Sequence, residues 1–153
     1  MLRVIFDVNI WLHAVLGPRS TYPYLDAVPL RTANPSADCL SLALDGEKFQ
    51  LFCSPHILNN VAKVLQLRGY DSSFVERYLE ALTDAVHFSG GSVVEPSRTV
   101  NRSGDFEDNL ILDLVAAVEA DLLVTLDREL QSLSPAKGAA ILDPDNFLQW
   151  VLR

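Results

Sequence analysis

The sequence predicts an α/β fold, a three-layer α/β/α sandwich built around a mainly parallel sheet. Two observations lead to this prediction. Short runs such as "RVIFD" at residues 3–7 and "DLLVTLD" at residues 121–127 are almost continuously apolar, which is typical of strands that are buried on both faces. These runs alternate with longer segments whose apolar residues recur at helical spacing, the arrangement expected when helices connect parallel strands.

The first half of the chain contains three of the expected helices and two of the strands. A strand at about residues 3–7 is followed directly by a helix that includes Trp11, Leu12 and Val15, and Gly17 with Pro18 ends this helix. Three prolines between Arg19 and Pro35 predict a loop or an irregular insertion. A helix in "SADCLSLALD" and a strand in "FQLFCS" come next. Ser54 followed by Pro55 is the preferred order for a helix cap and a first helical residue, so a third helix begins there.

The second half continues the alternation. We expect a helix over residues 72–86, a turn at residues 89–91 and an extended piece at residues 92–94. The block "GDFEDNLILDLVAAVEADLLVTLDREL" predicts a loop, a largely buried helix, a strand and a turn or short helix. "AAILDPDNFLQWVL" predicts a closing strand and helix.

Composition limits the class of protein. At 153 residues with 49% hydrophobic content, we expect a single domain with a real core. No apolar run approaches the roughly 20 residues of a membrane helix, and the N-terminus lacks the pattern of a secretory leader, so we expect a cytoplasmic protein. Cys39 and Cys53 have no metal-type spacing, and we expect buried, reduced thiols. A net charge of −8 argues against broad electrostatic binding to nucleic acid, although a loaded cation site reverses the sign locally.

Three aspartates are expected at one edge of the sheet. Asp7 ends the first strand, Asp127 ends a later one, and Asp108 begins the helix that leads into that later strand. The carboxyl ends of parallel strands meet at one edge, where reactive groups gather. Helical angles place Asp108 on the shoulder of its helix's buried face and direct Asp113 toward solvent. The alternative for Asp108 is a favourable charge at a helix N-terminus, worth a few tenths to about 1 kcal/mol.

Three neighbouring carboxylates repel one another, so the arrangement favours a Mg²⁺ or Mn²⁺ site completed by water. Such a site activates water and stabilises charge on a phosphodiester, as in nucleases. No other catalytic set is present in the sequence. Thr125 has no histidine near it in the sequence, and the three histidines occur singly, as expected for surface or core residues. There is no phosphate-binding glycine loop and no Cys/His metal motif.

Several segments together resemble the PIN domain, a small α/β nuclease fold, and in particular the VapC-like toxin components of bacterial type II toxin-antitoxin pairs. "VIFDVNIWLHAVL" resembles the opening strand with its Asp-x-Asn, and "SPHILNNVAKVL" resembles the helix after the second strand. "DFEDNLILDLVAAVEADLLVTLDREL" resembles the acidic helix and the Val-Thr-x-Asp turn, and "ILDPDNFLQWVL" the closing strand and helix. The resemblance covers most of the chain.

The resemblance implies roles for individual residues. It implies that Asp7, Asp108 and Asp127 bind the metal and act in catalysis. The residues that it implies support this site are Asn9, Thr125 and Asp105.

Two positions depart from the family pattern. The helix after the second strand usually supplies a glutamate, and counting from Ser54 places that position at Asn60. Helical angles agree, since Asn60 lies at the rim of the apolar stripe while Asn59 points outward. Asn60 is therefore either a neutral oxygen ligand, a water-positioning group or a relic. Leu126 replaces a glycine common in relatives, and Glu129 is a nearby acid that would partly compensate for the missing one.

The sequence leaves functions of different classes open. The first is a metal-dependent endoribonuclease with metal-activated water, and the second is a PIN-fold binding module with weakened catalysis. A phosphotransferase with Asp7 as nucleophile is disfavoured because position 9 is not an aspartate and no lysine is well placed. The toxin resemblance implies an RNA substrate, a small antitoxin protein that covers the acidic edge, and a homodimer. Tyr22, Tyr24 and Arg31 either contact RNA or pack on the domain.

Overall fold

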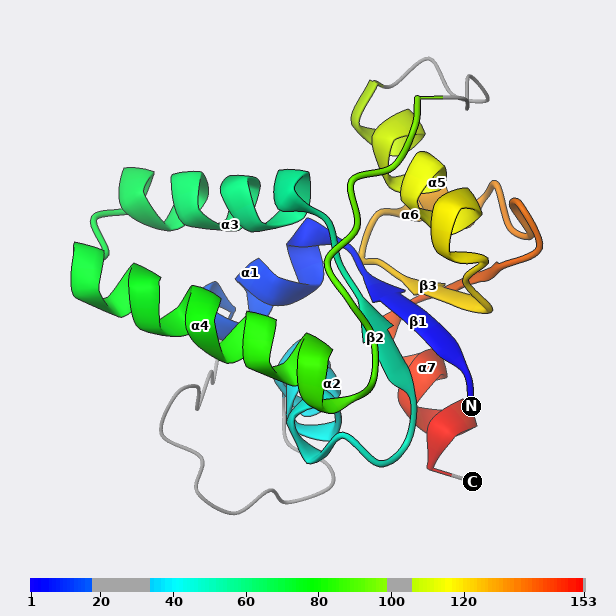
Figure 1. The fold of residues 1–153 in the computed structure, drawn as a ribbon, viewed down its shortest axis with the longest axis horizontal. Coiled ribbons are helices and arrows are strands. Elements are labelled where there is room, and N and C mark those ends of the chain that lie inside the picture. Colours follow the sequence, from blue (N-terminus) through cyan, green and yellow to red (C-terminus); the bar gives the residue numbers. More distant parts are fainter. Residues whose placement is uncertain (18–33, 99–105, 153) are drawn as a thin grey trace.

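A four-stranded parallel sheet forms the centre of the computed structural model, which describes residues 1–17, 34–98 and 106–152 (Figure 1). The strands are β1 (Arg3–Phe6), β2 (Gln50–Phe52), β3 (Leu122–Val124) and β4 (Ala140–Leu142). Their order across the sheet is β2-β1-β3-β4, and all three pairings are parallel. The predicted α/β class with a parallel sheet is therefore confirmed.

The described part of the chain forms seven helices, six of them between strands and the last one after β4. They are α1 (Val8–Leu16), α2 (Pro35–Asp45), α3 (Pro55–Leu67), α4 (Ser72–Phe88), α5 (Phe106–Val118), α6 (Arg128–Gln131) and α7 (Pro144–Val151). The chain leaves β1 toward β2 on one side and leaves β3 toward β4 on the other. The strand order thus reverses between β1 and β3, and ligands of open parallel sheets bind at the carboxyl ends of such a pair of strands.

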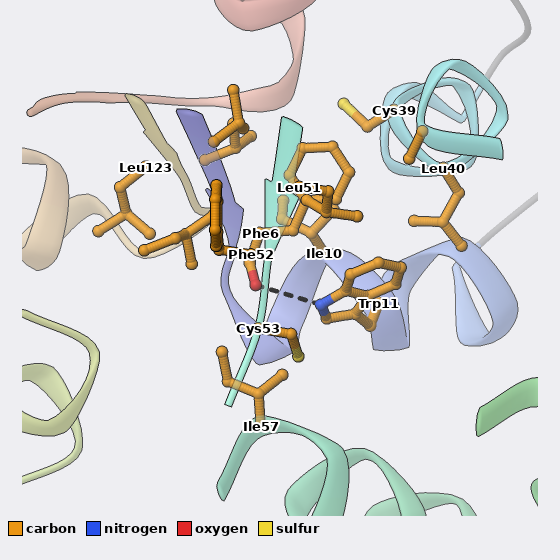
Figure 2. Packing of buried hydrophobic residues seen from close by; sticks show 14 of the residues in the cluster. Phe6, Ile10, Trp11, Cys39, Leu40, Leu51, Phe52, Cys53, Ile57 and Leu123 are labelled. Carbon is orange, nitrogen blue, oxygen red and sulfur yellow. Dashed lines mark hydrogen bonds between the residues drawn. The ribbon is translucent and has the colours of Figure 1, made fainter. Parts of the chain in front are cut away.

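Both faces of the sheet are covered. Val4, Ile5 and Phe6 are fully buried although successive strand residues point to opposite faces. On one face, the Phe6 ring makes edge contacts with Phe49 and with Phe147 of α7. The indole Nε1 of Trp11 donates a hydrogen bond to the carbonyl oxygen of Phe6 at 3.1 Å (Figure 2). This bond holds the start of α1 against the end of β1.

A helix cap confirms the predicted start of α3. The Ser54 hydroxyl accepts from the backbone N–H of Ile57 at 3.2 Å, and Pro55 is the first residue of α3. Helix α4 runs two residues beyond the predicted end, to Phe88. The extended piece that follows makes a parallel bridge between Val93 and Cys53. Gly91 is required there because a Cβ would collide with the carbonyl oxygen of Leu51.

The structure also bears on three other predictions: the state of the cysteines, the irregular segment before α2, and the lack of a membrane helix. Cys39 and Cys53 are buried free thiols, as predicted, and burial raises the pKa of Cys53 to about 12. Of the predicted irregular insertion, Pro35 instead begins α2, while Tyr22, Tyr24 and Arg31 lie outside the described residues. Within the part of the chain that the structure describes, no helix has the length and apolar character needed to cross a membrane.

Replacing Phe147 by alanine should lower the free energy of unfolding by about 3–5 kcal/mol, because it leaves a cavity between α7 and the sheet. Urea denaturation followed by circular dichroism measures this. Gln149→Ala, at an exposed position of the same helix, is the matched control and should change stability by no more than about 0.5 kcal/mol. Equal effects of the two variants would contradict this account of the core.

Candidate active site

A pocket of about 330 Å³ opens at the carboxyl ends of β1 and β3. Its walls come from α1, α3 and α5, and from the turn that precedes α6. The polar and charged side chains that line it are Asp7, Asn9, Ser54, His56, Asn60, Glu107, Asp108 and Asp127. The structure therefore brings the three predicted aspartates into one pocket.

Asp7 is fixed by the pairing of β1 with β3. Its backbone N–H donates to the carbonyl oxygen of Val124 at 2.9 Å, which extends the ladder by one residue. The Thr125 hydroxyl donates to Asp7 Oδ2 at 2.8 Å. The other oxygen, Oδ1, accepts from the backbone N–H of Val8 at 2.8 Å and caps α1. Both oxygens of Asp7 are thus oriented by the fold.

Asn9 joins the two strand ends. Its Nδ2 donates to Asp7 Oδ2 at 3.3 Å and to Thr125 Oγ1 at 3.1 Å. Its Oδ1 accepts from the backbone N–H of Leu126 at 3.0 Å. The Asp-x-Asn pattern therefore has a structural reason, because the asparagine ties the turn after β3 to the carboxylate after β1.

Asp127 lies three residues beyond β3, so the predicted strand ends earlier than the sequence indicated. Its Oδ1 accepts from the backbone N–H groups of Glu129 at 2.9 Å and Leu130 at 3.4 Å, which caps α6. Its own N–H donates to Thr125 Oγ1 at 3.1 Å. Thr125, fully buried, thus contacts both aspartates through one hydroxyl.

Electrostatics distinguish Asp7 from an ordinary surface aspartate. Desolvation by burial raises its pKa above the usual value of 3.8. The hydrogen bonds from Thr125 and Val8 oppose this shift, whereas the negative charges of Asp127 and Glu107 add to it. Acidic side chains from three parts of the chain therefore face the same space and repel one another there.

Helix α5 supplies Asp108 in its first turn, as predicted, with 5% of the residue exposed. The prediction for Asp113 was wrong. Asp113 is only 1% exposed, and its carboxylate accepts from Arg98 Nε at 3.1 Å. The apolar character of α5 extends around most of its circumference, so the side expected to face solvent is also covered, and the buried charge is paired with a cation.

His56 and Glu107 line the pocket but were not among the site residues predicted from the sequence. His56 Nε2 lies 2.6 Å from Glu107 Oε2 and 2.9 Å from Asn60 Nδ2. The only signals in the sequence were the spacing of four residues between His56 and Asn60, which puts them on one helix face, and the position of Glu107 next to Asp108. His56 was expected to be an isolated surface or core residue, but it lines the pocket.

The residues predicted to support the site lie in different places relative to the pocket. Asn60 lines the pocket and Asn59 is exposed, in agreement with the helical angles. Glu129 is exposed and is not among the pocket-lining residues; it contributes its backbone N–H to Asp127. Asp105 lies outside the described residues.

The donor set suits a hard divalent cation, since the pocket presents carboxylate and amide oxygens. Mutual repulsion at Asp7 is also what a cation would relieve. Among residues 1–17, 34–98 and 106–152, however, no three acidic, histidine or cysteine side chains are already grouped closely enough to hold an ion. The residues fit such a cation by chemistry, without a preformed coordination shell.

The sheet is parallel, and acidic side chains line a pocket where its strand order reverses. The protein is therefore an α/β protein with an acidic site at the edge of its sheet. Comparison with family models is more specific, because the PIN domain model matches residues 3–129, which include every pocket-lining residue. The chain belongs to the PIN domain family, a nuclease fold. Among curated proteins, the chain has no match.

The raised pKa of Asp7 predicts how stability depends on pH. The Asp7 carboxyl is harder to ionise in the folded chain than in the unfolded chain. Its contribution to the free energy of unfolding is therefore most favourable below pH 3.8, and it is lost as the pH rises through the folded-state pKa. Asp7→Asn, measured by urea unfolding in chelator, should therefore be more stable than wild type at pH 7, and the difference should shrink toward pH 3.

Asp71→Asn is the matched control with the opposite sign. Hydrogen bonds from the Ser73 side chain and backbone lower the pKa of Asp71, so its ionised form stabilises the fold. Asp71→Asn should be less stable than wild type at pH 7 and should approach it as the pH falls. A constant difference between Asp7→Asn and wild type from pH 3 to pH 8 would contradict the assignment at Asp7.

Proposed function

We propose that this protein is a metal-dependent endoribonuclease that hydrolyses RNA phosphodiester bonds. The observation that carries the proposal is the convergence of Asp7, Asp108 and Asp127 on one pocket at the carboxyl ends of β1 and β3. A pocket lined by acids would repel a phosphodiester on its own, so the same observation supports a cation as part of the working site.

Six residues at or beside the pocket have roles in this proposal. Asp7, Asp108 and Asp127 would hold Mg²⁺ or Mn²⁺, and the bound cation supplies a Lewis acid and a more acidic water. Thr125 and Asn9 hold the Asp7 carboxylate in one orientation through the bonds described above. Asn60 offers a neutral amide in a position where a carboxylate is expected.

The biological role follows from the resemblance to VapC-like proteins. In this proposal the chain is the toxin of a toxin-antitoxin pair, acts in the cytoplasm on RNA, forms a homodimer, and is inhibited by a small antitoxin protein. The acidic sheet edge is the surface that such an inhibitor would cover. The pocket's acidic lining favours an inhibitor that places a basic side chain there.

A second function is favoured by one specific observation. The amide of Asn60 lies 2.9 Å from His56 and brings no negative charge to the pocket. Losing one anionic ligand weakens a site for a hard cation. The alternative is therefore a PIN-fold binding module that holds RNA or a protein partner with weakened catalysis.

Cleavage assays distinguish these functions. Purified wild type should cleave a panel of single-stranded and structured RNAs with Mg²⁺ or Mn²⁺, and Asp7→Asn and Asp127→Asn should each lower the rate by at least about 100-fold because each removes an anionic ligand. Glu80→Gln, an equal charge change at an exposed position of α4, is the matched control and should keep the wild-type rate.

Two results would contradict the ribonuclease proposal. Wild type that cleaves no RNA with either metal would favour the binding module. Variants that cleave as fast as wild type would show that the activity does not arise at this pocket.

The toxin role has its own test. Expression of the chain from an inducible promoter should arrest growth, Asp7→Asn should not, and co-expression of the small protein encoded by the neighbouring reading frame should restore growth. Light scattering of the purified chain should give a dimer mass. Unimpaired growth with full expression of a chain that cleaves RNA in vitro would overturn the toxin role and leave the ribonuclease proposal intact.

A further inference from the structure

Asn60, where the family resemblance implies a glutamate, and Glu107 contact the same histidine side chain. Asn60 on α3 and Glu107 on α5 both contact a single atom, Nε2 of His56, at 2.9 Å and 2.6 Å. The three side chains therefore span the pocket from one wall to the other, and all three are among its lining residues. A carboxylate on α5 thus lies within one imidazole of the position where the family pattern has a carboxylate on α3.

Glu107 is suited to act in the pocket. It precedes Asp108 in the first turn of α5, where negative charge is favourable. Its side chain is 61% exposed, so its carboxylate remains hydrated and does not require burial of a charge. The negative charge of Glu107 also acts on Asp7, since it raises the pKa of Asp7 together with the charge of Asp127.

The contact with His56 gives Glu107 a defined place. Without it, an exposed glutamate in a helix's first turn would sample several rotamers. The short contact with the imidazole directs the carboxylate toward α3, across the pocket. Asn60 approaches the same imidazole nitrogen, so the amide and the carboxylate are neighbours.

We propose that Glu107 supplies a fourth carboxylate of the cation site, in place of the glutamate that the family resemblance implies at position 60. The pocket is lined by four carboxylates, Asp7, Asp108, Asp127 and Glu107, and the fourth of them comes from α5. This inference rests on the proposed function, because it assumes that the pocket binds a divalent cation. It removes the main reason for regarding the site as weakened.

Calorimetric titration of Mn²⁺ into the metal-free protein tests this without requiring an RNA substrate. Glu107→Gln should weaken Mn²⁺ affinity by at least about 10-fold, because it removes one anionic ligand while keeping size and shape. Moving the acid back, in the double variant Asn60→Glu with Glu107→Gln, should restore most of the affinity. Glu80→Gln is the matched control and should bind within about twofold of wild type.

The outcomes separate this inference from the proposed function. If Asp108→Asn loses affinity and Glu107→Gln binds like wild type, Glu107 is not a ligand and the cation site itself stands. If the double variant binds no better than Glu107→Gln, the exchange of positions is overturned. If wild type does not bind Mn²⁺, both the inference and the proposed function fail. A single cooperative thermal unfolding transition of each metal-free variant, well above the titration temperature, excludes misfolding as the cause.

Discussion

The parallel pairing of β1 with β3 is the interaction on which the rest of the structure depends. It aligns Phe6 with Val124, so the chain emerges from both strands at the same level. Asp7 follows β1 and Thr125 follows β3, and a 2.8 Å hydrogen bond joins their side chains. A shift of one residue in this register would point both side chains away from each other.

Helix capping helps the fold to tolerate charge repulsion at this edge of the sheet. Asp7 and Asp127 each cap a helix, so part of their negative charge is stabilised by backbone N–H groups. Burial nevertheless raises the pKa of Asp7, which means that the folded chain holds this carboxylate at a cost in stability. Sites that work on charged substrates commonly contain groups whose pKa is shifted in this way.

The sequence predicted most of the fold because the signals are local. Continuous apolar runs identified the strands, and Ser54 with Pro55 located the start of α3. The positions of strand ends and of a helix start can be read from patterns in the chain. They predicted that three aspartates, Asp7, Asp108 and Asp127, lie at one edge of the sheet. Their convergence followed from a general property of parallel sheets.

The errors concern contacts between distant residues. Asp113 was expected in solvent because helical angles describe one helix alone, whereas Arg98 reaches it from another part of the chain. His56 was regarded as isolated because its partner Glu107 lies 51 residues away. Neither pairing has a signature in a single sequence. Glu107 of α5 meets His56 of α3, and Arg98, which lies between α4 and α5, meets Asp113, only because the tertiary fold brings them together.

Asp7, Asp108 and Asp127 at this sheet edge are proposed to form one cation site. Paramagnetic line broadening by substoichiometric Mn²⁺ tests it most directly, in the two-dimensional NMR spectrum of backbone amides. If these acids share one cation, the amide signals of Asp7, Asp108 and Asp127 should broaden first and together, while exposed acids such as Asp71 keep their line widths. Broadening that begins at Asp71, or that spreads evenly over the surface acids, would contradict it.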